Sequence, residues 1–137
     1  MTEVFFYLGS EEGSNALFSL TQRLAQAAHQ RQRQVYIHCT DADQCRQLDA
    51  YLWQEPATSF LPHAPAGQQA PILLGWQEVP ADCHDVLINL APTVPDFFSR
   101  FMRVAEPVGA PENERQAARQ RWSFYLRRGY QVQKFDI

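Results

Sequence analysis

Short apolar runs alternate with longer amphipathic segments along the first half of the chain. Residues 4–8 and 35–39 are apolar runs bounded by polar or small residues, which predicts two buried strands. Apolar residues at helical spacing follow each run and predict helices over about 15–32 and from about 41 onward. Ser14 or Asn15 is expected to cap the first helix, and Thr40 or Asp41 the second. The expected inward positions are Leu17, Leu20, Leu24 and Ala28 on the first helix, and Cys45, Leu48 and Leu52 on the second.

The second half of the chain continues the same alternation. Residues 72–76 and 85–90 predict two more strands, whereas periodicity at 100–104 fits either a strand or a continued helix. A last helix is expected from Pro111 to about Arg128, because proline suits a first helical turn and Gly129 suits a C-cap. Residues 130–137 alternate, which predicts a final strand or an extended tail.

The order of these segments favours one α/β domain over residues 1–137. Strand–helix–strand–helix order is typical of a mainly parallel sheet flanked by helices and joined by right-handed crossovers. A chain of 137 residues is near the commonest domain size. The pattern contains no internal repeat or linker that would divide it.

Residues 51–67 break this regular pattern. The large apolar side chains Trp53, Phe60 and Leu61 lie here among three prolines. Each proline removes a backbone donor and fixes φ, so neither a regular helix nor a central strand fits the whole segment. Two interpretations remain: a loop that folds its aromatic side chains onto the nearest sheet, or a surface that docks a partner.

Composition limits the partners and the compartment. Hydrophobic residues make up 45% and charged residues 20%, with a net charge of −3, so the chain as a whole does not attract nucleic acid. The N-terminus lacks the basic start of a signal peptide, and apolar runs are too short to span a bilayer. Three cysteines fit no secreted framework. We therefore expect a cytoplasmic protein with no membrane contact.

The turn after the first predicted strand argues against a nucleotide cofactor. Residues 8–14 contain Gly9 and Gly13 but no lysine, and Glu11 and Glu12 would repel a phosphate at the helix start. We expect an α/β domain that lacks a phosphate loop and takes no cofactor.

A cluster of metal-binding and nucleophilic residue types supports one alternative function, a small metal- or thiol-dependent α/β enzyme. The spacing matches no zinc motif, and adjacent strand residues point to opposite faces, so we expect no metal site and no catalytic constellation. The residues that such an enzyme would use are His38, Cys39, Cys45, Cys83 and His84.

The last predicted helix carries a basic stripe. Arg115, Arg119 and Trp122 fall at positions i, i+4 and i+7, and therefore on one face. Two guanidinium groups beside an indole suit a short acidic peptide with an apolar end, and Val108 could line the same pocket. The alternatives are a solvated helix face with Trp122 in the core, and direct DNA binding. So few arginines on a net acidic domain would hold DNA only weakly.

These features together resemble the chi subunit family of bacterial DNA polymerase III, over nearly the whole chain. The most specific likeness is the tryptophan-to-proline-histidine segment at 53–63. The segments that carry the resemblance are 5–8, 48–63, 85–90, 115–125 and 129–130.

The resemblance implies a non-catalytic accessory subunit with two partners and a nucleotide-binding-like fold lacking a phosphate loop. Members of the family form a heterodimer with the psi subunit, which links them to the clamp loader, and they bind the acidic C-terminal tail of single-stranded DNA-binding protein (SSB). DNA would then be contacted only indirectly. The matching psi surface would be Trp53, Phe60, Leu61, Pro62 and His63, and the matching tail pocket would be Val108, Arg115, Arg119 and Trp122.

Two departures from the family bear on these partners. Position 115 is arginine where lysine is equally familiar, which keeps the charge but changes the donor geometry. The psi subunit diverges strongly among bacteria, and a repair helicase is the other partner that the family suggests for that surface.

Overall fold

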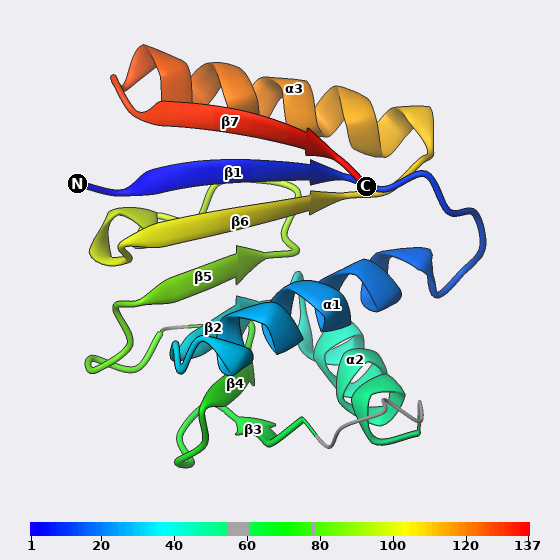
Figure 1. The fold of residues 1–137 in the computed structure, drawn as a ribbon, viewed down its shortest axis with the longest axis vertical. Helices are drawn as coiled ribbons and strands as arrows, with labels where there is room; N and C mark the ends of the chain where they lie inside the picture. The colour runs from blue at the N-terminus through cyan, green and yellow to red at the C-terminus, as the bar shows by residue number, and fades with distance from the viewer. Residues whose placement is uncertain (55–60, 78) are drawn as a thin grey trace.

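A seven-stranded parallel sheet organises the chain (Figure 1). The computed structural model describes residues 1–54, 61–77 and 79–137. The strand order is β3-β4-β2-β5-β6-β1-β7, and every neighbouring pair is parallel. The strands are β1 (Glu3–Leu8), β2 (Val35–His38), β3 (His63–Pro65), β4 (Ile72–Gly75), β5 (Val86–Asn89), β6 (Arg103–Val108) and β7 (Gln131–Asp136). The α/β class and the parallel sheet predicted from the sequence are confirmed.

Helices cover both faces of this sheet. They are α1 (Ala16–Gln30), α2 (Ala42–Gln54) and α3 (Glu112–Arg127), with a 3-10 turn η1 (Phe98–Arg100) before β6. Figure 1 shows α1 and α2 in front of the β2 half of the sheet and α3 behind the β1–β7 edge. Each strand alternates its side chains between the two layers, so the molecule has two apolar cores.

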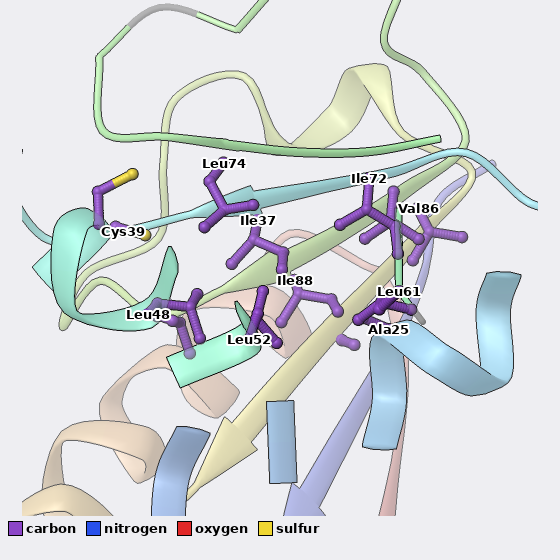
Figure 2. Packing of buried hydrophobic residues seen from close by; sticks show 14 residues of the cluster. Ala25, Ile37, Cys39, Leu48, Leu52, Leu61, Ile72, Leu74, Val86 and Ile88 are labelled. Carbon is purple, nitrogen blue, oxygen red and sulfur yellow. The ribbon is translucent and has the colours of Figure 1, made fainter. Parts of the chain in front are cut away.

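The core beneath α1 and α2 contains the helix positions expected to point inward, except Leu20, which is buried but does not belong to this cluster. Leu48 and Leu52 of α2 pack against Ile37, Ile72 and Ile88 of three neighbouring strands, as Figure 2 shows. These aliphatic side chains are almost wholly removed from water. The hydrophobic effect therefore fixes α2 over β2 and β4.

Local signals mark the start of α2 and the end of α3 as expected, whereas Asn15, the N-cap of α1, forms no side-chain capping hydrogen bond within the described part of the chain. Asp41 Oδ1 accepts a hydrogen bond from the Gln44 N–H at 2.8 Å, and Gln44 Oε1 accepts one from the Thr40 N–H at 2.6 Å. This reciprocal arrangement satisfies backbone donors that a helix start leaves unpaired. Gly129 has a φ of +84°, which ends α3 in the left-handed conformation that glycine adopts without strain.

The secondary structure of two segments becomes clear only from the strand pairing in the sheet. Residues 103–108 form β6, a buried strand between β5 and β1, so the ambiguous 100–104 segment is the end of η1 followed by a strand rather than a continued helix. The proline-broken segment contains β3, a three-residue strand that the sequence pattern did not predict. It lies at the sheet edge, where proline is tolerated because one side needs no hydrogen-bond donor.

Candidate partner-binding sites

The basic stripe of α3 lies beside a cavity of about 400 Å³ at the β1–β7 edge. Arg115, Arg119 and Trp122 all line it, so the structure brings these three predicted residues together. The remaining lining residues come from the strands below and from α3 itself; they are Phe6, Leu8, Ala118 and Lys134. The arrangement is an apolar floor with three cationic side chains around it.

The cationic side chains differ in how they are held. Arg115 Nη2 donates to the Gly9 carbonyl at 3.0 Å, while its Nε is buried with no hydrogen-bond partner among the described residues. Arg119 is exposed, and its Nη1 lies 3.0 Å from Glu112 Oε1. An exposed pair of this kind is weak, so Arg119 can exchange Glu112 for another carboxylate at little cost.

Trp122 both packs against the protein and faces the cavity. Its indole is half-buried and meets the Phe6 ring edge-on, with centroids 5.2 Å apart. The sequence left two interpretations of this tryptophan, a core residue or a binding residue. The geometry combines them, because packing on Phe6 holds the ring in place while it lines the cavity.

Val108 does not join this group. It pairs in register with Leu8, but it lies on β6, one strand further from the β7 edge, and only 1% of it is exposed. Among the described residues it lines a different hollow, together with Leu90 and Arg121. Phe6 and Leu8 supply the apolar floor that the sequence assigned to Val108.

Lys134 is a lining residue that the sequence analysis missed. It stands opposite Phe6 in the β1–β7 register, and so its side chain belongs to the α3 face of the sheet. Alternation alone places Val132 and Lys134 on one face of a strand. Only the pairing of β7 with β1 shows which face that is.

The predicted psi surface contains both exposed and buried residues. Trp53, in the last turn of α2, is 57% exposed, and Pro62 is half-buried. Leu61 is 4% exposed and belongs to the core beneath α2. Phe60 lies outside the described residues. Leu61, which the resemblance placed on the psi surface, therefore packs into the protein's own core, where burial stabilises it.

His63 supports Trp53 instead of facing solvent. Its side chain is fully buried, with Nδ1 2.7 Å from the Leu61 carbonyl oxygen and Nε2 3.2 Å from Asp49 Oδ1. The imidazole and indole centroids are 4.6 Å apart. Part of the segment folds back onto the protein, as one interpretation held, and this part positions an exposed tryptophan, as the other required.

Trp76 is a further exposed aromatic residue that the sequence analysis placed inside a strand. β4 ends at Gly75, and Trp76 is 41% exposed beside a broad hollow lined also by Pro65 and Pro80. The apolar run from 72 gave no sign of this early end. A buried glycine at position 75, packed close to Tyr36, marks the point where the strand stops.

The residues of the alternative thiol or metal enzyme are spread over the fold. Cys39 and Cys45 lie in the core beneath α1 and α2, whereas Cys83 lies in the core beneath α3, and all three are reduced. His84 is exposed, and His38 packs on Phe97. Over residues 1–54, 61–77 and 79–137, no group of three or more His, Cys, Asp or Glu side chains could hold a metal ion.

Thiol chemistry finds little support in the surroundings of these cysteines. A hydrogen bond with Cys45 and burial raise the pKa of Cys39, and burial raises the pKa of Cys83. The same hydrogen bond lowers the pKa of Cys45, but that residue lies on the buried face of α2, in the core beneath the helix. A nucleophilic cysteine needs both thiolate character and access.

The carboxyl end of β1, where α/β proteins commonly bind phosphates, is acidic. A hollow there is lined by Glu11, Glu12 and Glu114, with no arginine or lysine among its described lining residues. Such a lining repels phosphate. Separately, none of the helices in the described part of the chain has the length and apolar character to cross a membrane.

Comparison with known proteins identifies the family of this fold. Residues 1–133 match the family of the DNA polymerase III chi subunit, HolC. The DNA polymerase III subunit chi of Pseudomonas aeruginosa is 40% identical over 135 residues, covering 97% of this chain and 95% of that protein. The subunit chi of Escherichia coli K12 is 32% identical over 136 residues, covering 93% and 92%. The chain therefore belongs to the chi subunit family of DNA polymerase III, a replication accessory subunit.

Proposed function

We propose that this chi-family chain is a non-catalytic bridge that acts in the cytoplasm between two protein partners, the psi subunit of the clamp loader and the C-terminal tail of SSB. The observation that carries the proposal is the cavity between α3 and β1–β7. There Arg115, Arg119 and Lys134 stand around an apolar floor that includes Trp122.

The chemistry of this cavity suits an acidic peptide that ends in an apolar residue. Guanidinium groups offer forked donors to carboxylates, and among the described residues the exposed Arg119 is held only by its exposed pair with Glu112. The rings of Phe6 and Trp122 offer apolar contact area for a terminal side chain. The chain as a whole carries a net charge of −3, so this local cluster also selects where an acidic tail docks.

The psi surface is assigned to the exposed end of α2 and the start of β3. Trp53 is its anchor, and the buried imidazole of His63 packs against the Trp53 indole. Pro62 precedes His63 in the chain and is half-buried. Large aromatic side chains held in place by their neighbours are the commonest energetic centres of protein interfaces. A repair helicase is a second partner that the same surface would accept, in competition with psi.

The two surfaces lie at opposite edges of the sheet. β3 is the strand at one end of the order and β7 is the strand at the other. Partners at these edges do not block one another, so both can be held together. Such a bridge raises the effective concentration of the clamp loader at SSB-coated DNA without a tight contact at either site.

Isothermal titration calorimetry with an SSB tail peptide tests the first contact. We expect 1:1 binding that weakens as salt rises, because the carboxylate pairs are partly exposed. A peptide without its terminal apolar residue should bind more weakly. Equal binding of the full and truncated peptides would refute the proposed role of the apolar floor.

Titration of psi into the preformed peptide complex tests the bridge. Equal psi affinity with and without bound peptide is expected for two separate sites. If the peptide displaced psi, the two partners would share one surface and the bridge would be wrong.

A further inference from the structure

A second cavity, of about 340 Å³, lies on the opposite face of the β1–β7 edge from the α3 cavity. Residues of β1 alternate between the two: Phe6 and Leu8 line the α3 cavity, whereas Phe5 and Tyr7 line this one. Figure 1 shows α1 displaced toward β5 and β2, so that β1 and β7 are uncovered by helix on this face. None of the described residues assigned to the SSB tail or to the psi subunit lines this second cavity.

Three aromatic rings form a layered group on this open face. Phe135 of β7 stacks with Tyr7 at 5.6 Å between centroids and with Phe5 at 6.2 Å, with interplanar angles of 20° and 29°. Phe135 is 42% exposed. Together with Phe5 and Tyr7 it forms a patch of adjacent rings rather than a single exposed apolar residue, and exposed patches mark interaction sites.

Arginines surround the rings. Arg31, Arg33 and Arg103 all line the cavity, and its described lining contains no aspartate or glutamate. The Arg103 guanidinium lies 5.9 Å from the centroid of the Phe5 ring. Burial raises the pKa of Tyr7, and the charges of Arg103 and Arg31 oppose this effect, which places both cations near the phenol.

The acidic groups nearby neutralise only part of this charge. Arg33 Nη1 pairs with Asp85 Oδ1 at 3.1 Å, whereas no ion pair is formed by Arg31 or Arg103 with the described residues. Glu3 stands opposite Arg103 in the β1–β6 register but does not line the cavity. Two cations therefore remain available beside exposed rings.

We propose that this face binds single-stranded DNA directly, with nucleobases stacked on the Phe135 group and phosphates held by Arg31 and Arg103. Aromatic rings with adjacent cations on an open sheet are the combination that single-stranded nucleic acid needs. A duplex hides the faces of its bases, whereas a single strand exposes them for stacking. The contact needs neither SSB nor psi, so it stands or fails separately from the bridging function.

Fluorescence anisotropy with a labelled oligothymidine at low salt tests the proposal. The Phe135→Leu variant keeps apolar area but removes the stacking ring, and we expect about 5- to 100-fold weaker binding. An abasic oligonucleotide of the same length should also bind the wild type more weakly. Arg31→Gln and Arg103→Gln should each lower the slope of log affinity against log salt by about 0.7.

Matched controls separate this face from general charge and from the tail site. Arg127→Gln removes an exposed arginine from α3, and Arg119→Ala alters the α3 cavity; both should leave oligothymidine binding unchanged. Thermal unfolding of each variant checks that the sheet is intact. The proposal is overturned if oligothymidine does not bind the wild-type protein. It is also overturned if Phe135→Leu binds oligothymidine as tightly as the wild type does, or if the wild type binds the abasic strand as tightly as oligothymidine. Binding of an acidic peptide, and not of oligothymidine, to this face would overturn it as well.

Discussion

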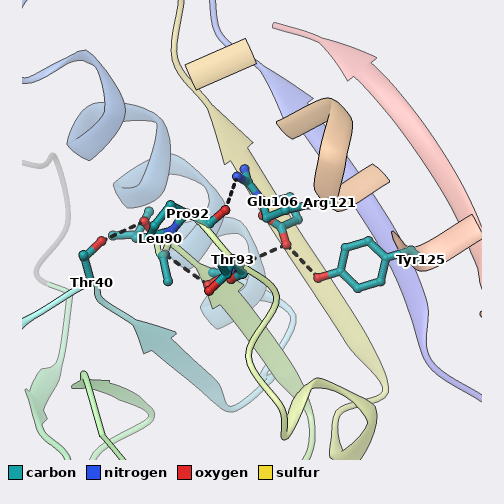
Figure 3. A network of polar contacts seen from close by, with 9 residues as sticks. Thr40, Leu90, Pro92, Thr93, Glu106, Arg121 and Tyr125 are labelled. Atoms are coloured by element: carbon teal, nitrogen blue, oxygen red, sulfur yellow. Dashed lines mark hydrogen bonds and ion pairs between the residues drawn. The ribbon is translucent and has the colours of Figure 1, made fainter. Parts of the chain in front are cut away.

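The Nε of Arg121 donates to Oε1 of Glu106 at 2.9 Å, and the two side chains are only 8% and 0% exposed. The Tyr125 hydroxyl donates to the other carboxylate oxygen at 2.7 Å, as Figure 3 shows. Asn89 Nδ2 donates to the same oxygen at 3.0 Å. Arg121 Nη1 also reaches the Pro92 carbonyl at 3.1 Å. This buried network joins α3 to β5 and β6, and so fixes the helix that carries Arg115, Arg119 and Trp122.

Glu106→Gln is expected to lower the free energy of unfolding by about 3–5 kcal/mol, because it leaves the Arg121 cation buried without its counter-charge. Urea unfolding followed by circular dichroism measures this. Glu112→Gln is the matched control: this exposed residue should change stability by less than about 0.5 kcal/mol. Similar stability of both variants would show that the buried pair contributes little.

Arg119→Ala should weaken binding of the SSB tail peptide by about 1–3 kcal/mol through loss of a charge-assisted pair. Calorimetry in low salt gives the affinity. Glu112→Gln releases Arg119 from its present partner and should not lower the affinity for the peptide. Unchanged affinity in Arg119→Ala would remove this residue from the site.

Lys134→Ala should act mainly on the salt dependence of tail binding. Lys134 is exposed at the rim of the cavity, where a charge steers association and contributes less than about 1 kcal/mol. The association rate, measured by stopped flow at several salt concentrations, is expected to fall and to vary less with salt than in the wild type. A salt dependence equal to that of wild type would exclude Lys134 from the electrostatic contact.

Trp53→Ala should weaken psi binding by about 2 kcal/mol or more, as the loss of a central aromatic anchor does. The fold should be retained, because more than half of this side chain is exposed. Trp76→Ala removes an exposed tryptophan that lines a different hollow, and should bind psi normally. Pull-down and calorimetry with purified psi compare the two variants; an equal loss in both would indicate a surface centred elsewhere.

Stability is expected to fall as pH is lowered through the region where His38 titrates. Burial lowers the pKa of His38, and its Nδ1 has no partner among the described residues. The unfolded chain takes up a proton near its ordinary pKa of about 6.5, while the folded state does so only at lower pH. The stability that His38 contributes is therefore complete above that pKa and is lost as pH falls from it toward the folded value.

Replacement of His38 by phenylalanine keeps a ring against Phe97 and removes the titration. The difference in unfolding free energy between wild type and His38→Phe should then change in favour of the variant between about pH 7.5 and about pH 5.5. Urea midpoints at the two pH values give this difference. A pH-independent difference would assign the acid sensitivity to other groups.

The sequence by itself determined the local elements. Apolar periodicity predicted four of the strands and all three helices, because burial of one face and the spacing of residues along a helix or strand are local properties. It left residues 100–104 open between a strand and a helix, and residues 130–137 open between a strand and a tail. Asp41 and Gly129 marked helix ends for the same reason, since capping involves only neighbours along the chain. The stripe of Arg115, Arg119 and Trp122 followed from helical spacing alone.

Tertiary structure decided which of these elements meet. The parallel pairing of β7 with β1 placed Lys134 beside Phe6 and Phe135 beside Tyr7, and moved the apolar floor from Val108 to Phe6 and Leu8. The edge position of β3 allowed a short strand among prolines and buried Leu61 and His63 while Trp53 stayed exposed. Strand order and register come from contacts between residues far apart in the chain, and such contacts leave no periodic trace in the sequence.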